Sequence, residues 1–193
     1  MTNKKVTEIP IFLKFYNKFL TKKECDSIIA ISKDKFVKSQ VYSSNNINTI
    51  VNNNVRSSSS YTITSKDPLF EKIKNKVSEL LVIPKENFET LQVQKYEKGQ
   101  QYYPHYDYIQ GMENQRIKTF IIYLNRLKKI DGGCTSFTHY NYKIKPETGM
   151  AICFDNVDSN GNVNPKTMHA GELINTDAIK YILTIWIRQN KYV

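Results

Sequence analysis

The chain has little of what builds disulfide frameworks or metal clusters: 193 residues contain only three cysteines and three histidines. Cys25, Cys134 and Cys153 form an odd set without the close spacing of a zinc site. This set argues against a disulfide scaffold and fits a reducing compartment.

Long hydrophobic runs are also missing. The longest apolar stretch near the N-terminus, residues 9 to 13, is interrupted by Pro10, whereas a membrane-spanning helix needs about 20 apolar residues. No secretory signal pattern is visible. We therefore expect a cytoplasmic protein without a membrane partner; the secretory pathway would require that a leader had been removed.

Acidic residues are in deficit, with 18 Asp and Glu against 28 Lys and Arg, a formal net charge of +10. Positive surfaces attract nucleic acid, anionic lipid or acidic peptides. The lysines are scattered rather than gathered with aromatic residues into one run, so nucleic acid is not the favoured partner. No feature of the sequence indicates an oligomeric state.

A chain of this length, with 40% hydrophobic residues, suffices for one domain with a sizeable core. We expect a single domain over residues 1–193, with N-terminal helical support over about 8–88 and a β core over about 89–190. Thr21 and Glu24 form a capping box that predicts a helix over residues 22–32. Asp67-Pro68 predicts a second helix start, and the apolar period of that helix ends before Pro84.

From residue 89 onward, short runs rich in β-branched and aromatic residues are separated by Gly, Asn and Asp. This pattern is typical of a sandwich or barrel, so the predicted fold is mainly β, an α+β arrangement with helices outside a β core. Residues 43–60 and 156–164 are polar loops, and we expect them to be mobile lids over a groove.

One group of side chains is suited to metal binding. His105 and Asp107 are two residues apart, and side chains at this spacing on a strand point to the same face. His169 could complete a set of two histidines and a carboxylate, typical of non-haem Fe(II) oxygenases, whereas zinc is more often four-coordinate. His139 has no carboxylate two positions on, so we expect it to lie in a solvated turn.

Lys180 is the only charged residue inside the apolar run 178–187. A lysine avoids burial unless it is paired. Its ammonium could reach water at the mouth of the strand, or it could lie beside the metal and hold a substrate carboxylate.

The order of these motifs resembles the prolyl 4-hydroxylases among the Fe(II)- and 2-oxoglutarate-dependent dioxygenases. Residues 91–102 lead into the His-x-Asp pair, residues 132–137 read Gly-Gly-Cys-Thr-Ser-Phe, and Lys180 lies 11 residues after His169. Upstream, residues 56–58 are similar to the family's Arg-x-Ser segment. The resemblance covers roughly residues 8 to 190.

The resemblance implies a double-stranded β-helix, or jelly-roll, core. It also implies a procollagen-proline 4-dioxygenase type of activity, which hydroxylates peptidyl proline with O2 and 2-oxoglutarate, releases succinate and CO2, and uses Fe(II) and ascorbate. The chain would then be one catalytic domain whose partner is a proline-containing peptide or protein.

Site residues follow by matching position. The resemblance gives His105, Asp107 and His169 as metal ligands, and Lys180 as the catalytic partner of the 2-oxoglutarate carboxylate. It also implies cosubstrate contacts at Tyr96, Thr135 and Trp186, and substrate contacts at Arg56, Arg116, Arg188 and Tyr108. Surface charge is the alternative for Arg116 and Arg188.

The sequence departs from the family pattern at two positions, and these bear on the identity of the substrate more than on the metal chemistry. Cys134 stands where many relatives have Glu, and Arg188 where many have His. Three alternatives stay open: a lysyl hydroxylase, an oxygenase acting on nucleic acid, and a catalytically silent peptide-binding module. Lys180 favours the prolyl branch, because the first two alternatives usually hold 2-oxoglutarate with arginine, and the intact ligand set argues against the third.

Overall fold

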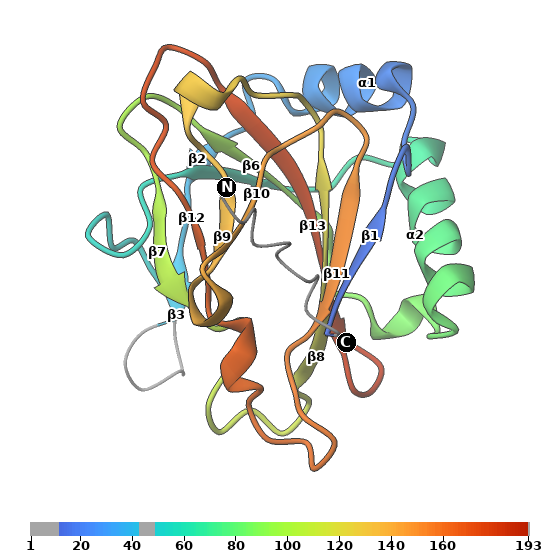
Figure 1. Cartoon of the computed structure of the whole chain (residues 1–193). Coiled ribbons are helices and arrows are strands. Elements are labelled where there is room, and N and C mark those ends of the chain that lie inside the picture. Colours follow the sequence, from blue (N-terminus) through green and yellow to red (C-terminus); the bar gives the residue numbers. More distant parts are fainter. Residues whose placement is uncertain (1–11, 43–48, 193) are drawn as a thin grey trace, which may run out of the picture.

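A computed structural model describes residues 12–42 and 49–192 of the chain as a β-sandwich with two α-helices on one side (Figure 1). The helices are α1 (Lys22–Ser32) and α2 (Pro68–Leu81). The strands are β1 (Leu13–Tyr16), β2 (Val37–Lys38), β3 (Val41–Tyr42), β4 (Thr49–Ile50), β5 (Ser59–Thr62), β6 (Gln92–Tyr96), β7 (Tyr102–His105), β8 (Arg116–Tyr123), β9 (Thr135–Phe137), β10 (Tyr142–Ile144), β11 (Ala151–Asp155), β12 (His169–Gly171) and β13 (Lys180–Arg188).

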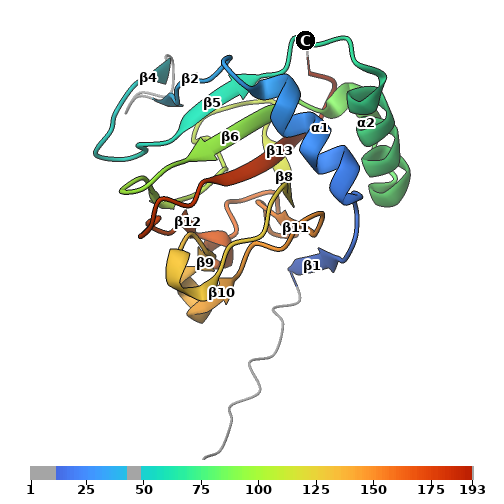
Figure 2. The same ribbon diagram turned by 90° about the horizontal axis from the view of Figure 1, so that it is seen from above.

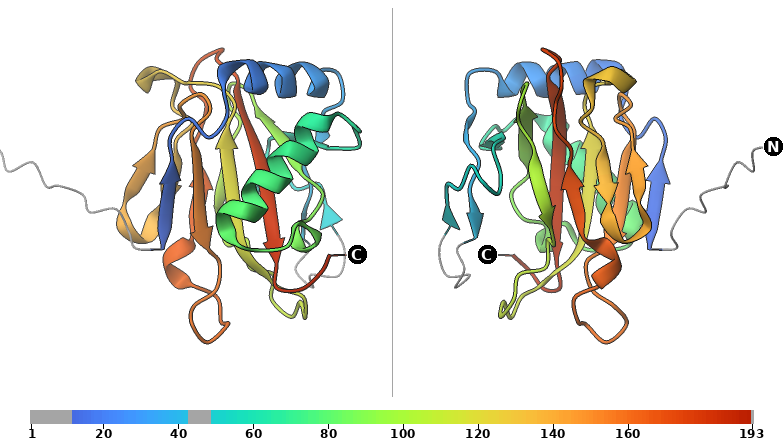
Figure 3. Two further views of the ribbon diagram at one scale, coloured as in Figure 1. Left: turned by 90° about the vertical axis from the view of Figure 1, so that its right-hand side faces the viewer. Right: turned by 60° about the vertical axis from the view of Figure 1, so that its left-hand side comes forward.

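The strands form two larger antiparallel sheets and one short ribbon. The seven-stranded sheet has the order β1-β11-β8-β13-β6-β5-β2, the four-stranded sheet has the order β10-β9-β12-β7, and β3 pairs with β4. In Figure 2, α1 and α2 lie on one side of the large sheet, and β9, β10 and β12 lie on the other. Figure 3 shows α2 crossing the face of the large sheet.

The expected boundary near residue 89 does not separate helices from strands. β1, β2 and β5 all precede it, yet each is a member of the seven-stranded sheet. These strands have two to four residues, too few to produce a period-two pattern that sequence reading could detect.

Both predicted helices begin at their predicted caps. The Glu24 backbone N–H donates to Thr21 Oγ1, and the Thr21 N–H donates to the Glu24 carboxylate, which completes the capping box. At α2, Asp67 Oδ1 accepts from the Leu69 N–H at 2.8 Å. The helix ends at Leu81, before Pro84 as expected, and Val82 closes it with a φ of 55°.

Strand β13 divides the interior into two layers. Leu183, Ile185 and Ile187 belong to the hydrophobic cluster shared with the two helices, because alternate side chains of a strand point to opposite faces. Lys180, Ile182, Thr184 and Trp186 therefore point the other way, into the space between the sheets. This layer is where the polar and charged side chains of the strand gather.

The two segments predicted to be lids are described to different extents by the structure. Residues 43–48 lie outside the described part of the chain, and residues 49–60 contain β4 and the first strand residues of β5. In the second segment, Asp158 Oδ1 accepts from the backbone N–H groups of Asn160 and Asn162, and Val157 pairs with Val163. A role as lids stays a prediction.

No helix within residues 12–42 and 49–192 is long and apolar enough to cross a membrane.

Gly149 joins the segment before α1 to the large sheet. Its carbonyl accepts from the Leu20 N–H at 3.1 Å, its φ is +76°, and a Cβ there would collide with the Leu20 carbonyl. We predict that Gly149→Ala lowers the free energy of unfolding by about 3 kcal/mol, because left-handed strain and a steric clash add up.

The matched control is Gly161→Ala, where φ is +80° but no atom lies within 4 Å of the new Cβ. Only the strain remains, so we expect a loss of about 1 kcal/mol. Urea unfolding of both variants measures the difference, and equal losses would contradict the predicted clash.

Candidate metal centre

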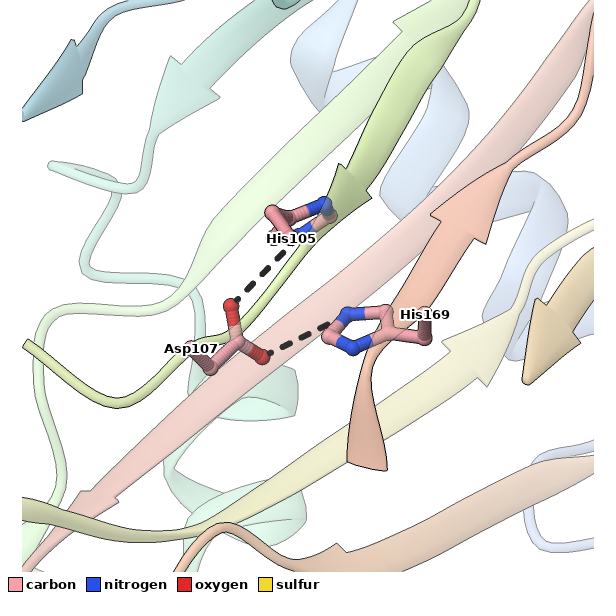
Figure 4. A group of neighbouring side chains, drawn as sticks. All are labelled: His105, Asp107 and His169. Carbon is pink, nitrogen blue, oxygen red and sulfur yellow. Dashed lines mark ion pairs between the residues drawn. The ribbon is translucent and has the colours of Figure 1, made fainter. Parts of the chain in front are cut away.

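Three side chains converge where β7 and β12 meet (Figure 4). His105 is the last residue of β7 and His169 the first of β12, and they are cross-strand partners in the register. Asp107 follows β7 rather than lying on it. Nε2 of His105 lies 3.8 Å from Asp107 Oδ1, and Nε2 of His169 lies 3.7 Å from Oδ2. One ligand atom from each residue lies within 4.8 Å of the others, a spacing that could hold a metal ion.

The backbone orients both imidazoles. Nδ1 of His105 lies 2.8 Å from the Tyr103 carbonyl oxygen, and Nδ1 of His169 lies 2.9 Å from that of Thr167. A carbonyl oxygen only accepts, so each Nδ1 carries the proton. The lone pair of each Nε2 is therefore directed toward Asp107, as a metal ligand requires.

Asp107 is held by residues that the sequence reading missed. Thr119 Oγ1 donates to Asp107 Oδ2 at 2.6 Å, and Asn156 Nδ2 donates to Thr119 Oγ1 at 2.9 Å. Burial opposes ionisation of Asp107, but His169, His105, Arg116 and the Thr119 hydroxyl together hold its pKa below the usual range. The carboxylate is therefore ionised and fixed in position.

Both histidines lie in an aromatic environment. Tyr102 stacks on His105 with ring centroids 3.5 Å apart, and Phe137 and Phe154 pack against His169. Burial, with a smaller effect of His169, lowers the pKa of His105 to about 3. Its imidazole is therefore neutral at physiological pH and available as a ligand. His139 is exposed in a short turn, as expected.

Lys180 lies in an inner cavity beside the three ligands. It is 1% exposed, so the interpretation in which its ammonium reaches water is wrong. Its Nζ lies 5.3 Å from the centroid of the Tyr96 ring and 6.0 Å from that of Tyr123. No carboxylate of residues 12–42 and 49–192 forms an ion pair with it, and burial lowers its pKa to about 8. An anionic ligand in this cavity would supply the missing charge.

Hydroxyl groups line the same cavity. Tyr96 and Thr135 are among its lining residues. The Tyr96 hydroxyl donates to Gln94 Oε1 at 3.1 Å, and the hydroxyl of Tyr123, which does not line the cavity itself, donates to Thr135 Oγ1 at 2.8 Å. Thr135 accepts there, so its own hydroxyl hydrogen is free to donate into the cavity. Sequence reading missed Tyr123, although alternation along β8 places it on the same face as Thr119.

A larger groove of about 840 Å³ opens outside the inner cavity. His105 and Asp107 lie in its wall, together with Tyr102 and Tyr108. Trp186 lines both spaces; it is 8% exposed, and its Nε1–H has no hydrogen-bond partner among the described residues. A bound molecule that spans the two spaces would find a donor there.

The three arginines predicted to contact substrate are all buried, so surface charge is wrong for Arg116 and Arg188. Arg116 binds Glu89 through Nε at 2.5 Å and Nη2 at 2.8 Å, and it lines the groove. Arg188 also approaches Glu89, with Nε 2.7 Å from Oε1, but it does not line the groove. Sequence reading missed Glu89, because ion pairing between distant residues leaves no local pattern.

Arg56 lines the groove and is fixed there by neighbours. Its Nε donates to Ser58 Oγ at 2.9 Å, and its Nη1 and Nη2 reach the Gln40 carbonyl and the Gln92 side chain. The guanidinium lies 4.8 Å from the centroid of the Tyr102 ring.

The described donors fit a hard divalent metal with an anionic cosubstrate. Two imidazoles and one carboxylate are the ligand set of Fe(II) sites that keep open positions. The buried ammonium of Lys180 and the free hydroxyl of Thr135 fit a carboxylate in the inner cavity.

The chain matches the family model described as the 2OG-Fe(II) oxygenase superfamily over residues 91–188. It is 30% identical to "Probable prolyl 4-hydroxylase 6" of Arabidopsis thaliana over 92% of this chain and 69% of the relative. It is also 30% identical to the "Putative prolyl 4-hydroxylase" of Acanthamoeba polyphaga mimivirus, over 91% of this chain and 74% of the relative. The chain belongs to the prolyl 4-hydroxylase family of 2OG-Fe(II) oxygenases.

A solved structure of this family also resembles the chain in three dimensions. The viral collagen prolyl hydroxylase of Paramecium Bursaria Chlorella virus-1, solved as its 2OG complex, has a TM-score of 0.74 and 30% identity. The match covers 92% of this chain and 96% of that one. The chain is an Fe(II)- and 2-oxoglutarate-dependent dioxygenase, as the sequence reading predicted.

Thr119→Val removes the hydroxyl that fixes Asp107 while keeping the shape of the side chain. We predict a loss of metal affinity of about tenfold, since removing such outer hydrogen bonds typically costs a factor of 10 to 100. Titration of the metal-free protein with Mn(II), followed by electron paramagnetic resonance, measures it. Thr62→Val, at an exposed position of β5, is the control, and equal affinities in the two variants would refute the role of Thr119.

Proposed function

We propose that this chain is a prolyl 4-hydroxylase, which hydroxylates peptidyl proline with O2 and 2-oxoglutarate and releases succinate and CO2. One observation carries the proposal: a buried lysine without an anionic partner among the described residues lies in a cavity beside a His-Asp-His ligand set. The names of the relatives supply the substrate class.

When bound, Fe(II) would activate O2, which is the oxidant; one of its oxygen atoms enters succinate as 2-oxoglutarate loses CO2, and the other is inserted into a C–H bond. His105, Asp107 and His169 hold the metal. Lys180 forms an ion pair with the distal carboxylate of 2-oxoglutarate. This pairing would anchor the cosubstrate in the inner cavity, beside the three ligand residues.

Other groups in the inner cavity complete the binding of 2-oxoglutarate. The hydroxyl of Thr135 donates to the same carboxylate as Lys180, and the buried Tyr96 lies against the Lys180 ammonium. Trp186 forms the boundary with the outer groove, and its N–H, which has no partner in the described part of the chain, is offered to the ligand on either side. Ascorbate is the proposed reductant that restores Fe(II) after turnover without substrate.

The outer groove is the proposed site for the proline-containing peptide. Tyr102 and Tyr108 give it aromatic walls, which suit an extended proline-rich chain, and Arg56 and Arg116 lie in the same walls. Arg188 acts behind the wall through Glu89 rather than by direct contact.

The proposed architecture is a single catalytic domain over residues 1–193 with a double-stranded β-helix core. Its support is the pair of facing sheets, with His105 at the end of β7 and His169 at the start of β12. In this arrangement β7 and β12 bring the metal ligands opposite the cosubstrate residues of β6 and β13.

The direct test is hydroxylation of a panel of proline-rich peptides by the protein with Fe(II), 2-oxoglutarate and ascorbate. We expect a gain of one oxygen at proline, found by mass spectrometry, with succinate formed in equal amount. Turnover that ignores every peptide, or a gain of oxygen at lysine, would refute the prolyl substrate. The Asp107→Asn variant should bind the metal more weakly and lose turnover.

The pKa of Lys180 predicts a pH dependence of cosubstrate binding. The ammonium form binds the dianion, so affinity is constant below the pKa of about 8 in the ligand-free protein. Above it a proton must be taken up on binding, and the dissociation constant rises by up to about tenfold per pH unit. Anaerobic calorimetry with the Mn(II) protein measures this.

Lys180→Met is the matched variant for this measurement. It should bind 2-oxoglutarate on the order of a hundredfold more weakly, and its affinity should no longer change between pH 7 and 10. A wild-type affinity that is flat over the same range would contradict the proposed ion pair, whereas Mn(II) binding should survive in the variant.

A further inference from the structure

Two arginine side chains, Arg116 and Arg188, lie against the carboxylate of Glu89. Arg116 makes two hydrogen bonds to the carboxylate, and Arg188 approaches the same oxygen Oε1 at 2.7 Å. The Arg188 Nε–H has no hydrogen-bond partner among the described residues, and its Nη1 donates to the Asn114 carbonyl at 2.7 Å. Glu89 therefore neutralises one guanidinium and leaves the other charge uncompensated.

This excess charge lies at the wall of the outer groove. Glu89 and Arg116 both line the groove, and Arg116 stacks over the Trp186 ring at 4.1 Å from its centroid. Glu89 uses Nε and Nη2 of Arg116.

The other charges of the groove add to the imbalance. Its lining contains Lys38, Arg56 and Arg116 as cations and Glu89 and Asp107 as anions. A divalent metal, Asp107, dianionic 2-oxoglutarate and Lys180 together carry no net charge. What remains is four cations, with Arg188 behind the wall, against the single carboxylate of Glu89, a net charge of +3.

We propose that this groove selects peptides with a carboxylate side chain next to the proline that is hydroxylated. The inference rests on the proposed prolyl hydroxylase function and names the chemical class of its substrate. A glutamate or aspartate beside the proline places its carboxylate near Arg116, where buried arginines without enough anions favour it. A lysine at the same position meets like charge at the same wall.

Arg188 is the positioning residue in this selection, because it acts through Glu89. If Glu89 met Arg116 alone, the pair would be neutral. The second guanidinium adds a positive charge beside this pair, so the group of Arg116, Glu89 and Arg188 keeps a net charge of +1 that attracts a peptide anion. Arg188 is the last residue of β13, where the pairing with β8 is irregular between Ile187 and Arg188.

The test uses peptides of one length and one neutral, proline-rich host sequence, with Glu, Gln or Lys beside the reacting proline. We expect kcat/KM to fall in the order Glu, Gln, Lys, with about tenfold between Glu and Lys at low salt. The ratio should shrink toward one at high ionic strength, because the groove is open to solvent and salt screens the attraction.

Two variants separate the local charge from the net charge of the protein. Arg188→Gln should reduce the ratio of Glu to Lys peptides about threefold, whereas Arg188→Lys should keep it. Lys33→Gln removes the same unit of charge at an exposed position after α1 and should leave the ratio unchanged. Equal ratios for Arg188→Gln and Lys33→Gln would assign the preference to net charge and overturn the proposal.

Two further results distinguish a failure of the proposed charge selection from a failure of the proposed prolyl hydroxylase function. Wild-type protein that treats Glu and Lys peptides alike, or whose preference ignores salt, overturns the selection even if all peptides are hydroxylated. If none of the three peptides is hydroxylated, the proposed function fails instead. The affinity of the three labelled peptides for the Mn(II) protein, measured by fluorescence anisotropy, then still reports whether the groove prefers an anion.

Discussion

The pairing register of β7 and β12 is the constraint on which the metal site depends. It places His105 directly opposite His169, so the ligand distance is set by backbone hydrogen bonding between strands. A shift of one residue would turn a histidine to the opposite face of the sheet. The carbonyls of Tyr103 and Thr167, each two residues before its histidine, then fix the ring orientations. The backbone of these two strands and the residues before them therefore determines both where the two imidazoles lie and which ring nitrogen carries the proton.

Sequence reading predicted local features well, because their causes are local. The capping box at Thr21 and the Asp67-Pro68 start rest on residues within one helical turn, and both predicted helix starts are confirmed. The pattern His-x-Asp with a distant histidine predicted a ligand set that the structure brings together. Mainly β structure was also predictable, since short runs of β-branched residues repeat from residue 89 onward.

What sequence reading missed arises from contacts between distant segments. Thr119, Tyr123 and Glu89 acquire their roles only when other strands bring Asp107, Thr135 and two arginines to them. The early strands β1, β2 and β5 were missed for another reason: two to four residues carry no measurable period, and pairing with a longer strand decides their conformation. The burial of Arg116 and Arg188 likewise follows from the carboxylate that they share.

Trp186 is the single tryptophan of the chain, and it lies where the inner cavity meets the outer groove. Its ring is covered on one side by the Arg116 guanidinium, and its N–H has no protein partner among the described residues. Any molecule that enters either space changes the polarity and hydrogen bonding of this one indole. The intrinsic fluorescence of this tryptophan therefore reports occupancy of the site, and no attached dye is needed.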